Sequence, residues 1–148
     1  MSGSRTFKAL LNTYRGLVKR NPGNSRLLMA RGVLYHLFGM HKKALKDFNR
    51  LLALRSGTAA IYFLRSDCYF NLGNFMLAWK DLMRGRMISI QNGSPGKRTT
   101  RAKYIHKPEE FTPGEKAEIA EILHYERNRI FYTLIPDIFL PPGSEKVK

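Results

Sequence analysis

YHLFGMHKKALKDFNR, at residues 35–50, returns with changes as YFNLGNFMLAWKDLMR at residues 69–84. The two stretches align without a gap, so one constant offset takes Tyr35 to Tyr69 and every other residue to its counterpart. A fixed period of this length indicates stacked helix hairpins, in which each unit buries its apolar face against the next. Such chains hold partners more often than they transform substrates. The matched residues are Tyr35, Gly39, Ala44, Lys46, Asp47 and Arg50, which return as Tyr69, Gly73, Ala78, Lys80, Asp81 and Arg84.

Several residues of the repeat have a physical role in a hairpin. Gly39 stands where the first helix ends, because glycine accepts the left-handed backbone of such a turn. Ala44 lets the second helix approach closely, and Phe48 shares its face because side chains four apart stack. Tyr35 is placed to fill the cleft between the helices, and Gly32 is a small residue in the first helix. The equivalents in the second unit are Gly73, Ala78, Leu82, Tyr69 and Ser66.

This order of residues resembles the tetratricopeptide repeat (TPR) family, whose consensus runs small residue, Tyr, Gly, Ala and then an aromatic or large apolar residue. Two full units follow at residues 25–58 and 59–92, with Leu51 and Gly85 in place of a usual alanine. Stepping back by one period from Phe48 gives Tyr14. Residues 6–20 are therefore predicted to be the second helix of an incomplete unit, closed by Asn21-Pro22-Gly23-Asn24.

The resemblance implies an all-α fold, a short TPR-like α-α solenoid of about two and a half repeats over residues 1–92. Turn formers at residues 92–96 interrupt the helical pattern, so residues 93–111 are predicted to form a basic linker arm. Thr112-Pro113-Gly114-Glu115 has the form of a capping box. It predicts a helix from Pro113 to Ile135 that caps the second repeat. Its apolar face contains Ile119, Ile122, Leu123, Ile130, Phe131 and Leu134.

Residues 112–148 thus comprise a capping helix and a tail. The tail begins as Pro136-Asp137-Ile138-Phe139-Leu140-Pro141-Pro142, which we expect to be irregular because of its prolines. Ile138, Phe139 and Leu140 form an apolar run that is expected to dock. Two alternatives remain open: the run folds back along the solenoid, or it binds another protein.

Positive charge is concentrated in the repeat half of the chain. Residues 1–92 contain 16 Lys or Arg and 3 Asp or Glu, whereas residues 93–148 contain 10 and 8. The two parts carry +13 and +2, which together give the formal charge of +15. A surplus of this size repels itself unless an acidic partner neutralises it.

Two groups of cations are the candidate contacts for such a partner. The alternative for both groups is a solvated surface without a binding role. The first group lies on or beside second helices, which the resemblance places on the convex face: Lys42, Lys43, Lys46, Arg50, Lys80, Arg84 and Arg86. The second lies in the arm, which is predicted to be extended: Lys97, Arg98, Arg101 and Lys103.

The resemblance also implies a concave groove, and this groove is apolar. Family members that clamp acidic chaperone tails use Lys and Asn at places where this chain has Met29, Val33, Phe63 and Asp67. A hydrophobic peptide, or the chain's own tail, suits such a groove better. The alternative is that these residues are core. The groove residues are Met29, Val33, Leu37, Phe63 and Phe70.

Catalytic and metal-binding patterns are not found. Cys68 is the only cysteine and falls inside a predicted helix, which favours a buried structural thiol. His36 and His41 are five residues apart, not the four that place two ligands on one helical face. Neither a phosphate-binding glycine loop nor a membrane-spanning run occurs, so we expect no enzyme activity, cofactor, metal or membrane.

Three hypotheses from different classes remain, and an enzyme ranks last because catalytic patterns are not found. The first is an intracellular, cytoplasmic adaptor in a large assembly, whose basic face binds an acidic protein surface such as tubulin. Microtubules are acidic polymers, and small TPR proteins with irregular tails resemble components of ciliary axonemes. The alternative is an RNA-associated or ribosome-associated protein, in which phosphates supply the acidity.

Overall fold

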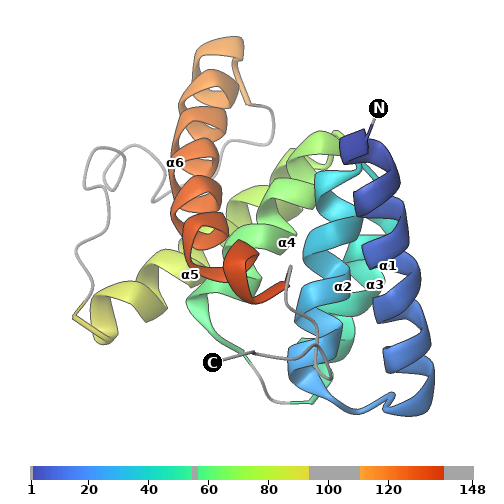
Figure 1. Cartoon of the computed structure of the whole chain (residues 1–148). Coiled ribbons are helices and arrows are strands. Elements are labelled where there is room, and N and C mark those ends of the chain that lie inside the picture. Colours follow the sequence, from blue (N-terminus) through green and yellow to red (C-terminus); the bar gives the residue numbers. More distant parts are fainter. Residues whose placement is uncertain (1, 55–56, 94–110, 139–148) are drawn as a thin grey trace. The chain divides into compact units, whose positions relative to one another are not determined.

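The computed structural model describes residues 2–54, 57–93 and 111–138. All regular secondary structure within these ranges is α-helical (Figure 1). The chain divides into two compact units, unit 1 with residues 1–56 and 129–148 and unit 2 with residues 57–128. The helices are α1 (Ser2–Arg20), α2 (Ser25–Leu37), α3 (His41–Ala53), α4 (Ala59–Asn71), α5 (Phe75–Gln91) and α6 (Pro113–Ile138). The all-α prediction is confirmed for the described residues.

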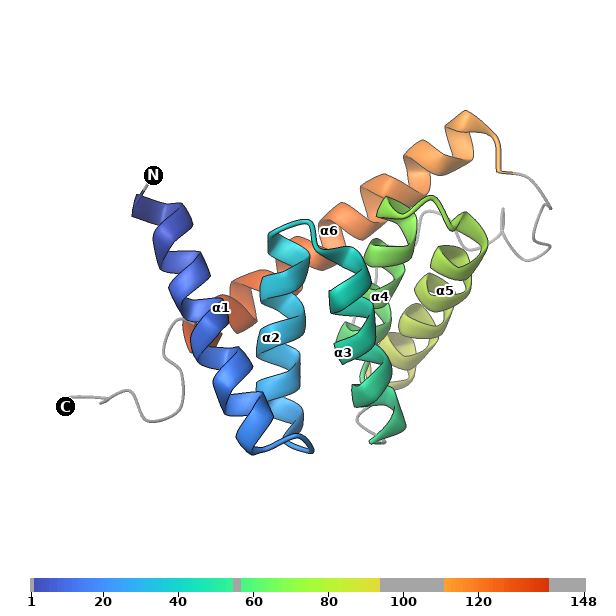
Figure 2. The ribbon, with the colours of Figure 1, turned by 90° about the vertical axis from the view of Figure 1, so that its right-hand side faces the viewer.

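Unit 1 contains α1, α2, α3 and the last part of α6. Helix α2 lies between α1 and α3 (Figure 2). The expected helix over residues 6–20 is present and begins earlier, at Ser2. Its buried face repeats every three to four residues, as an amphipathic helix requires, and consists of Leu10, Leu11, Tyr14 and Val18. After the turn at residues 21–24, the Asn24 side chain caps α2 by accepting a hydrogen bond from the Leu27 amide at 3.1 Å.

The two hairpin turns have the same hydrogen-bond pattern at equivalent positions of the repeat. Gly39 and Gly73 have φ values of 75° and 80°, in the left-handed region that favours glycine. In the first turn the Met40 amide donates to the Tyr35 carbonyl at 2.8 Å, and in the second the Asn74 amide donates to the carbonyl of Tyr69 at 2.9 Å. The predicted glycine turns are therefore confirmed.

Glycine and phenylalanine bring the two helices of each hairpin together. A Cβ atom at Gly32 of α2 would lie 2.8 Å from Cε1 of Phe48 in α3. In the second hairpin the order is reversed, since a Cβ atom at Gly85 of α5 would lie 2.8 Å from Cε1 of Phe63 in α4. Each hairpin thus packs a buried aromatic ring directly against the backbone of the facing helix.

Unit 2 contains α4, α5 and the first part of α6. The capping box that opens α6 is present. The Thr112 amide donates to Oε1 of Glu115 at 2.8 Å, and the Glu115 amide donates to Oγ1 of Thr112 at 3.1 Å. These reciprocal bonds fix the start of α6 at Pro113, as the sequence predicts.

The end of α6 differs from the prediction. The helix continues to Ile138 and includes Pro136, which we expected to begin an irregular tail. A proline removes one helical hydrogen bond, so the last turn needs other support. In unit 1 the Tyr14 hydroxyl donates to the Ile138 carbonyl at 2.8 Å, and the Ile138 side chain is buried. These two contacts hold the final turn.

None of the helices in the described ranges combines the length and the apolar character that crossing a bilayer requires.

Candidate protein-interaction surfaces

The three acidic residues of the repeat half all point inward. Asp47, Asp67 and Asp81 are the only acidic residues among residues 1–92, and each is at most 5% exposed. A buried carboxylate needs a partner, because removing an unpaired charge from water is costly. All three form ion pairs with arginine side chains.

Two of these pairs repeat with the period of the sequence. In unit 1, Arg31 donates from Nη2 to Asp47 at 2.6 Å and from Nε at 2.9 Å. In unit 2, Arg65 makes the same bidentate contact with Asp81, from Nη2 at 2.7 Å and from Nε at 2.6 Å. Paired bonds of this kind are strong and directional. The hydrogen bonds raise the pKa of both guanidinium groups, although burial opposes this effect.

The third pair joins two elements of unit 2. Nη1 of Arg127, in α6, lies 3.2 Å from Oδ2 of Asp67, in α4. It helps to dock the first part of α6, alongside the apolar side chains Ile119, Ile122 and Leu123, which are buried. The sequence predicts the apolar contact and does not predict this polar one.

Because the aspartates are internal, exposed charge on α1–α5 is positive throughout the described residues. No acidic side chain is exposed in residues 2–54 or 57–93. The cations of these ranges that are exposed are Lys8, Arg15, Lys19, Arg20, Arg26, Lys42, Lys43, Lys46, Arg50, Lys80 and Arg84. Pairing therefore removes the few negative charges from the surface and leaves it uniformly cationic.

Helix α3 presents the densest part of this surface. Lys42, Lys43, Lys46 and Arg50 are all exposed, and steps of three and four residues keep them on one side of the helix. We call these four residues the α3 cationic face. The opposite side of α3, with Ala44, Phe48 and Leu51, is buried. The Lys43 ammonium lies 5.8 Å from the centre of the Tyr35 ring, a cation–π contact that restrains its side chain.

Arg86 is a correction to the predicted basic surface. In unit 2, its neighbours Lys80 and Arg84 are exposed, whereas Arg86 is only 7% exposed. Burial lowers the pKa of Arg86, and the nearby buried carboxylate of Glu126 opposes this shift. Nη1 of Arg86 has no hydrogen-bond partner within the described part of the chain. Arg86 is therefore a buried charged residue, because it lies on the buried side of α5.

The predicted groove residues do not form one exposed lining. Val33 and Phe63 are fully buried, and Met29 and Phe70 are half-buried. Only Leu37 is exposed, at 38%. Phe63 is buried because Gly85 leaves room for its ring. Val33 and Phe63 are therefore core residues, which was the alternative that the sequence left open.

The remaining predicted contacts lie partly outside the described residues. Lys97, Arg98, Arg101 and Lys103 of the arm fall there, as do Phe139 and Leu140 of the tail. Ile138 is the described member of the apolar run, and it is buried in unit 1 with its carbonyl bonded to Tyr14. This residue therefore docks within its own chain.

Two histidines approach each other although their spacing does not favour it. His36 is in the last turn of α2 and His41 is the first residue of α3, and their Nδ1 atoms are 2.9 Å apart. The hairpin turn at Gly39 produces this contact. Helical spacing alone is therefore an incomplete test for pairs that flank a turn.

The only cysteine has the buried position that the sequence indicates. Cys68 in α4 is fully buried. Burial raises the pKa of its thiol far above the usual value, and the neighbouring Asp67 charge adds to this effect. Because the thiolate is the reactive form, Cys68 is poorly suited to act as a nucleophile.

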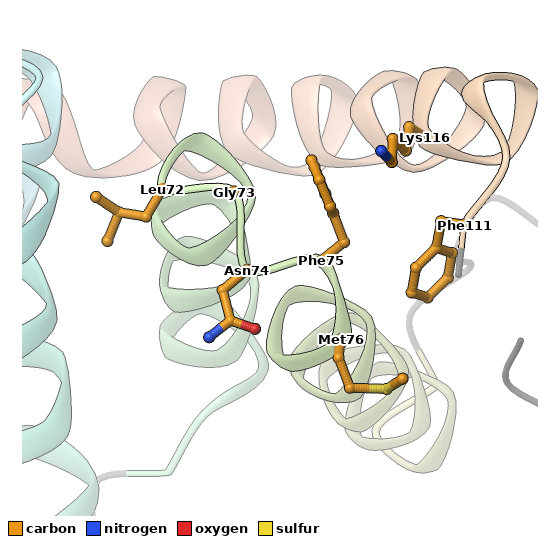
Figure 3. Close-up of a pocket in the computed structure, with 7 residues that line it drawn as sticks. All are labelled: Leu72, Gly73, Asn74, Phe75, Met76, Phe111 and Lys116. Atoms are coloured by element: carbon orange, nitrogen blue, oxygen red, sulfur yellow. The ribbon is translucent and has the colours of Figure 1, made fainter. Parts of the chain in front are cut away.

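A hollow of about 550 Å³ lies between the starts of α5 and α6 in unit 2 (Figure 3). We call it the α5–α6 pocket. Phe75 points from α5 towards α6, where Lys116 lies, and the Lys116 ammonium is 4.4 Å from the centre of the Phe75 ring. The sequence predictions did not include this pocket. One clue was Phe111, an apolar residue directly before the capping box, where such residues pack. The lining residues are Leu72, Gly73, Asn74, Phe75, Met76, Phe111 and Lys116.

Comparison of the chain with protein-family models, with curated proteins and with solved structures finds no match.

Proposed function

We propose that this protein is a non-enzymatic, TPR-like scaffold whose cationic surface binds an acidic protein surface within a large assembly. The observation that carries the proposal is the inward placement of Asp47, Asp67 and Asp81, each in an ion pair with arginine. A surface with cations and no exposed acids, as on the described parts of α1–α5, attracts acidic partners and repels basic ones.

The repeated geometry supports the scaffold part of the proposal. Helix pairs α2–α3 and α4–α5 share the glycine turn, the arginine–aspartate pair and the buried alanine at equivalent positions. Helix hairpins that repeat the same internal bonds at a fixed period are typical of repeat proteins, including those of the TPR type. A buried, poorly ionised Cys68 supports a binding role over nucleophilic catalysis.

Microtubules are the partner that we propose first, because they are extended acidic polymers. Through them the chain would belong to the cytoskeleton, and the ciliary axoneme is the assembly that the sequence resemblance favours. The α3 cationic face is the proposed contact, since its four cations share one side of a helix. The binding is expected to weaken as salt screens the charges.

Co-sedimentation of the purified 148-residue chain with microtubules at low salt tests this contact. Reversal of the α3 face in Lys42→Glu, Lys43→Glu and Lys46→Glu is expected to reduce affinity by roughly tenfold or more, since three attractions become repulsions. The matched control carries Lys8→Glu, Arg15→Glu and Lys19→Glu in α1. It has the same net charge and is expected to lose much less affinity.

Two results would contradict the proposal. Wild-type protein that stays in the supernatant at low salt excludes the microtubule contact. Equal losses in the α3 and α1 variants show that overall charge, and not the α3 cationic face, determines binding.

A nucleic-acid partner is the second candidate, and the same cationic surface favours it. Phosphate neutralisation predicts a steep fall in affinity for RNA as salt increases. Weak binding that does not change with salt would argue against this alternative. We rank it second because bases stack on exposed aromatic rings, whereas the ring beside the α3 cations, Tyr35, is buried beneath Lys43 and Arg31.

A further inference from the structure

We propose that the α5–α6 pocket binds a segment of a partner protein in which a large apolar side chain is followed by a glutamate or aspartate. The described lining of the pocket belongs entirely to unit 2. The inference does not depend on the α3 cationic face, which is in unit 1, so the two proposals can fail separately.

The apolar side chains that line the pocket favour an apolar group in the ligand. Leu72 is 40% exposed, and Phe75 and Met76 are half-buried. In Figure 3 the Met76 side chain leaves α5 on the side where Phe111 lies. An aromatic or aliphatic side chain placed here would cover these groups and gain from burial of apolar surface. The volume of about 550 Å³ is within the range of ligand sites, and the described residues do not enclose the hollow, which suits one side chain of a longer segment.

The positive charge in the described lining of the pocket favours a carboxylate in the ligand. Among the described residues of the lining, Lys116 is the only charged one. The carboxylate of the adjacent Glu115 accepts the Thr112 amide, so it is committed to the capping box. The first turn of α5, which borders the pocket, contains no acidic residue to offset its positive end. An acidic group next to the apolar side chain would therefore meet a complementary charge.

The position of Lys116 explains why the apolar and the acidic residue of the ligand should be neighbours. Its ammonium lies over the Phe75 ring at 4.4 Å, so the cation stands at the edge of the apolar surface. A ligand that fills the hollow brings its neighbouring residue next to this cation. The expected motif is thus an apolar residue and an acidic one in succession, and a lone charge or a lone apolar group would bind less well.

Binding in the pocket can be followed by tryptophan fluorescence. Trp79 is the only tryptophan of the chain, and its ring centre is 6.4 Å from that of Phe111, which lines the pocket. A ligand that contacts Phe111 is expected to change the environment of Trp79 and hence its emission. Peptides without tryptophan or tyrosine leave this emission free of background.

The experiment uses the 148-residue chain and three peptides. The peptides are acetyl-Gly-Phe-Glu-Gly-amide, the same peptide with Gln for Glu, and the same peptide with Ala for Phe. Affinity is measured by Trp79 fluorescence and independently by titration calorimetry. We expect saturable binding of the first peptide, roughly threefold to fivefold weaker binding of the Gln peptide, as for one exposed ion pair, and no saturation with the Ala peptide.

Two variants localise the effect. Lys116→Met keeps the apolar stem and is expected to bind the Glu and Gln peptides equally. Lys80→Met removes an exposed cation of α5 that does not line the pocket, and it should keep the wild-type preference. The inference is overturned if no peptide binds by either method, if the Glu and Gln peptides bind the wild-type protein equally, or if Lys116→Met retains the preference for Glu.

Discussion

Replacing Gly85 by alanine tests how closely α4 and α5 are packed. The new Cβ atom would lie 2.8 Å from Cε1 and 2.9 Å from Cδ1 of Phe63, whereas ordinary contacts begin at 3.4 Å. The ring would have to move by about 0.6 Å, and it is only 2% exposed, so its neighbours resist the movement. Overpacking of this kind costs about 1–3 kcal/mol. The higher helix propensity of alanine returns about 1 kcal/mol.

The chain offers a matched control at Gly16, in the interior of α1. A Cβ atom there would have its nearest neighbour, the flexible end of Arg20, at 3.8 Å. Gly16→Ala therefore gains the propensity without the clash, and it should raise the free energy of unfolding by about 0.5–1 kcal/mol. Urea denaturation followed by circular dichroism is expected to place Gly85→Ala about 1–3 kcal/mol below Gly16→Ala.

A rescue experiment separates this clash from a general defect. The first hairpin has Met29 and Leu51 where the second has Phe63 and Gly85. Gly85→Leu alone should be strongly destabilising, and adding Phe63→Met should recover about 1–3 kcal/mol relative to the sum of the single changes. The reasoning is refuted if Gly85→Ala is as stable as Gly16→Ala, or if the Leu and Met changes are additive.

Three further predictions concern single contacts. Thr112→Ala removes half of the capping box and should cost about 1 kcal/mol, measured by urea denaturation, whereas Thr112→Ser should cost little. Tyr14→Phe leaves the Ile138 carbonyl without its tyrosine donor and should cost about 1 kcal/mol at neutral pH. Burial raises the pKa of Tyr14, so the wild-type advantage should shrink as pH rises above about 10, where the unfolded chain ionises first; an advantage that grows in this range would contradict the assignment. Cys68 should react with a thiol reagent only after the protein unfolds, and rapid labelling of the native protein would show that the thiol is accessible.

The helices and turns, apart from the end of α6, were predictable because their causes are local. Gly39 and Gly73 are required by backbone conformation, and Thr112 and Glu115 cap a helix through neighbouring groups. Such requirements leave fixed patterns over a few residues. Constant spacing between the repeats then extended the local pattern to whole hairpins.

Burial of individual side chains was harder to predict because it depends on pairs of helices. Phe63 matches Met29 in the other repeat and was expected to line a groove, yet Gly85 on the facing helix makes room for its ring. Phe63 is larger than its counterpart Met29, and Gly85 is smaller than its counterpart Leu51, so a larger side chain on α4 faces a smaller residue on α5. The pattern along one helix at a time does not reveal this compensation.

The repeat spacing of two arginines and two aspartates indicates the buried ion pairs. Arg31 and Arg65 are separated by one repeat period, like their partners Asp47 and Asp81, which predicts paired contacts in both units. The charge count gives the net charge of residues 1–92, but it does not show which charged side chains are buried. On the described parts of α1–α5 the surface is more uniformly positive than the count implies, because ion pairing places every aspartate of residues 1–92 inside.

The proposed binding of an acidic protein surface is tested most directly by competition between microtubules and RNA. The labelled 148-residue chain is bound to microtubules at low salt, and single-stranded RNA is added until its negative charges equal those of the microtubules. If the α3 cationic face recognises an acidic protein surface, most of the protein should remain in the microtubule pellet. Transfer of the protein to the soluble RNA at equal charge would contradict the account and favour the nucleic-acid alternative.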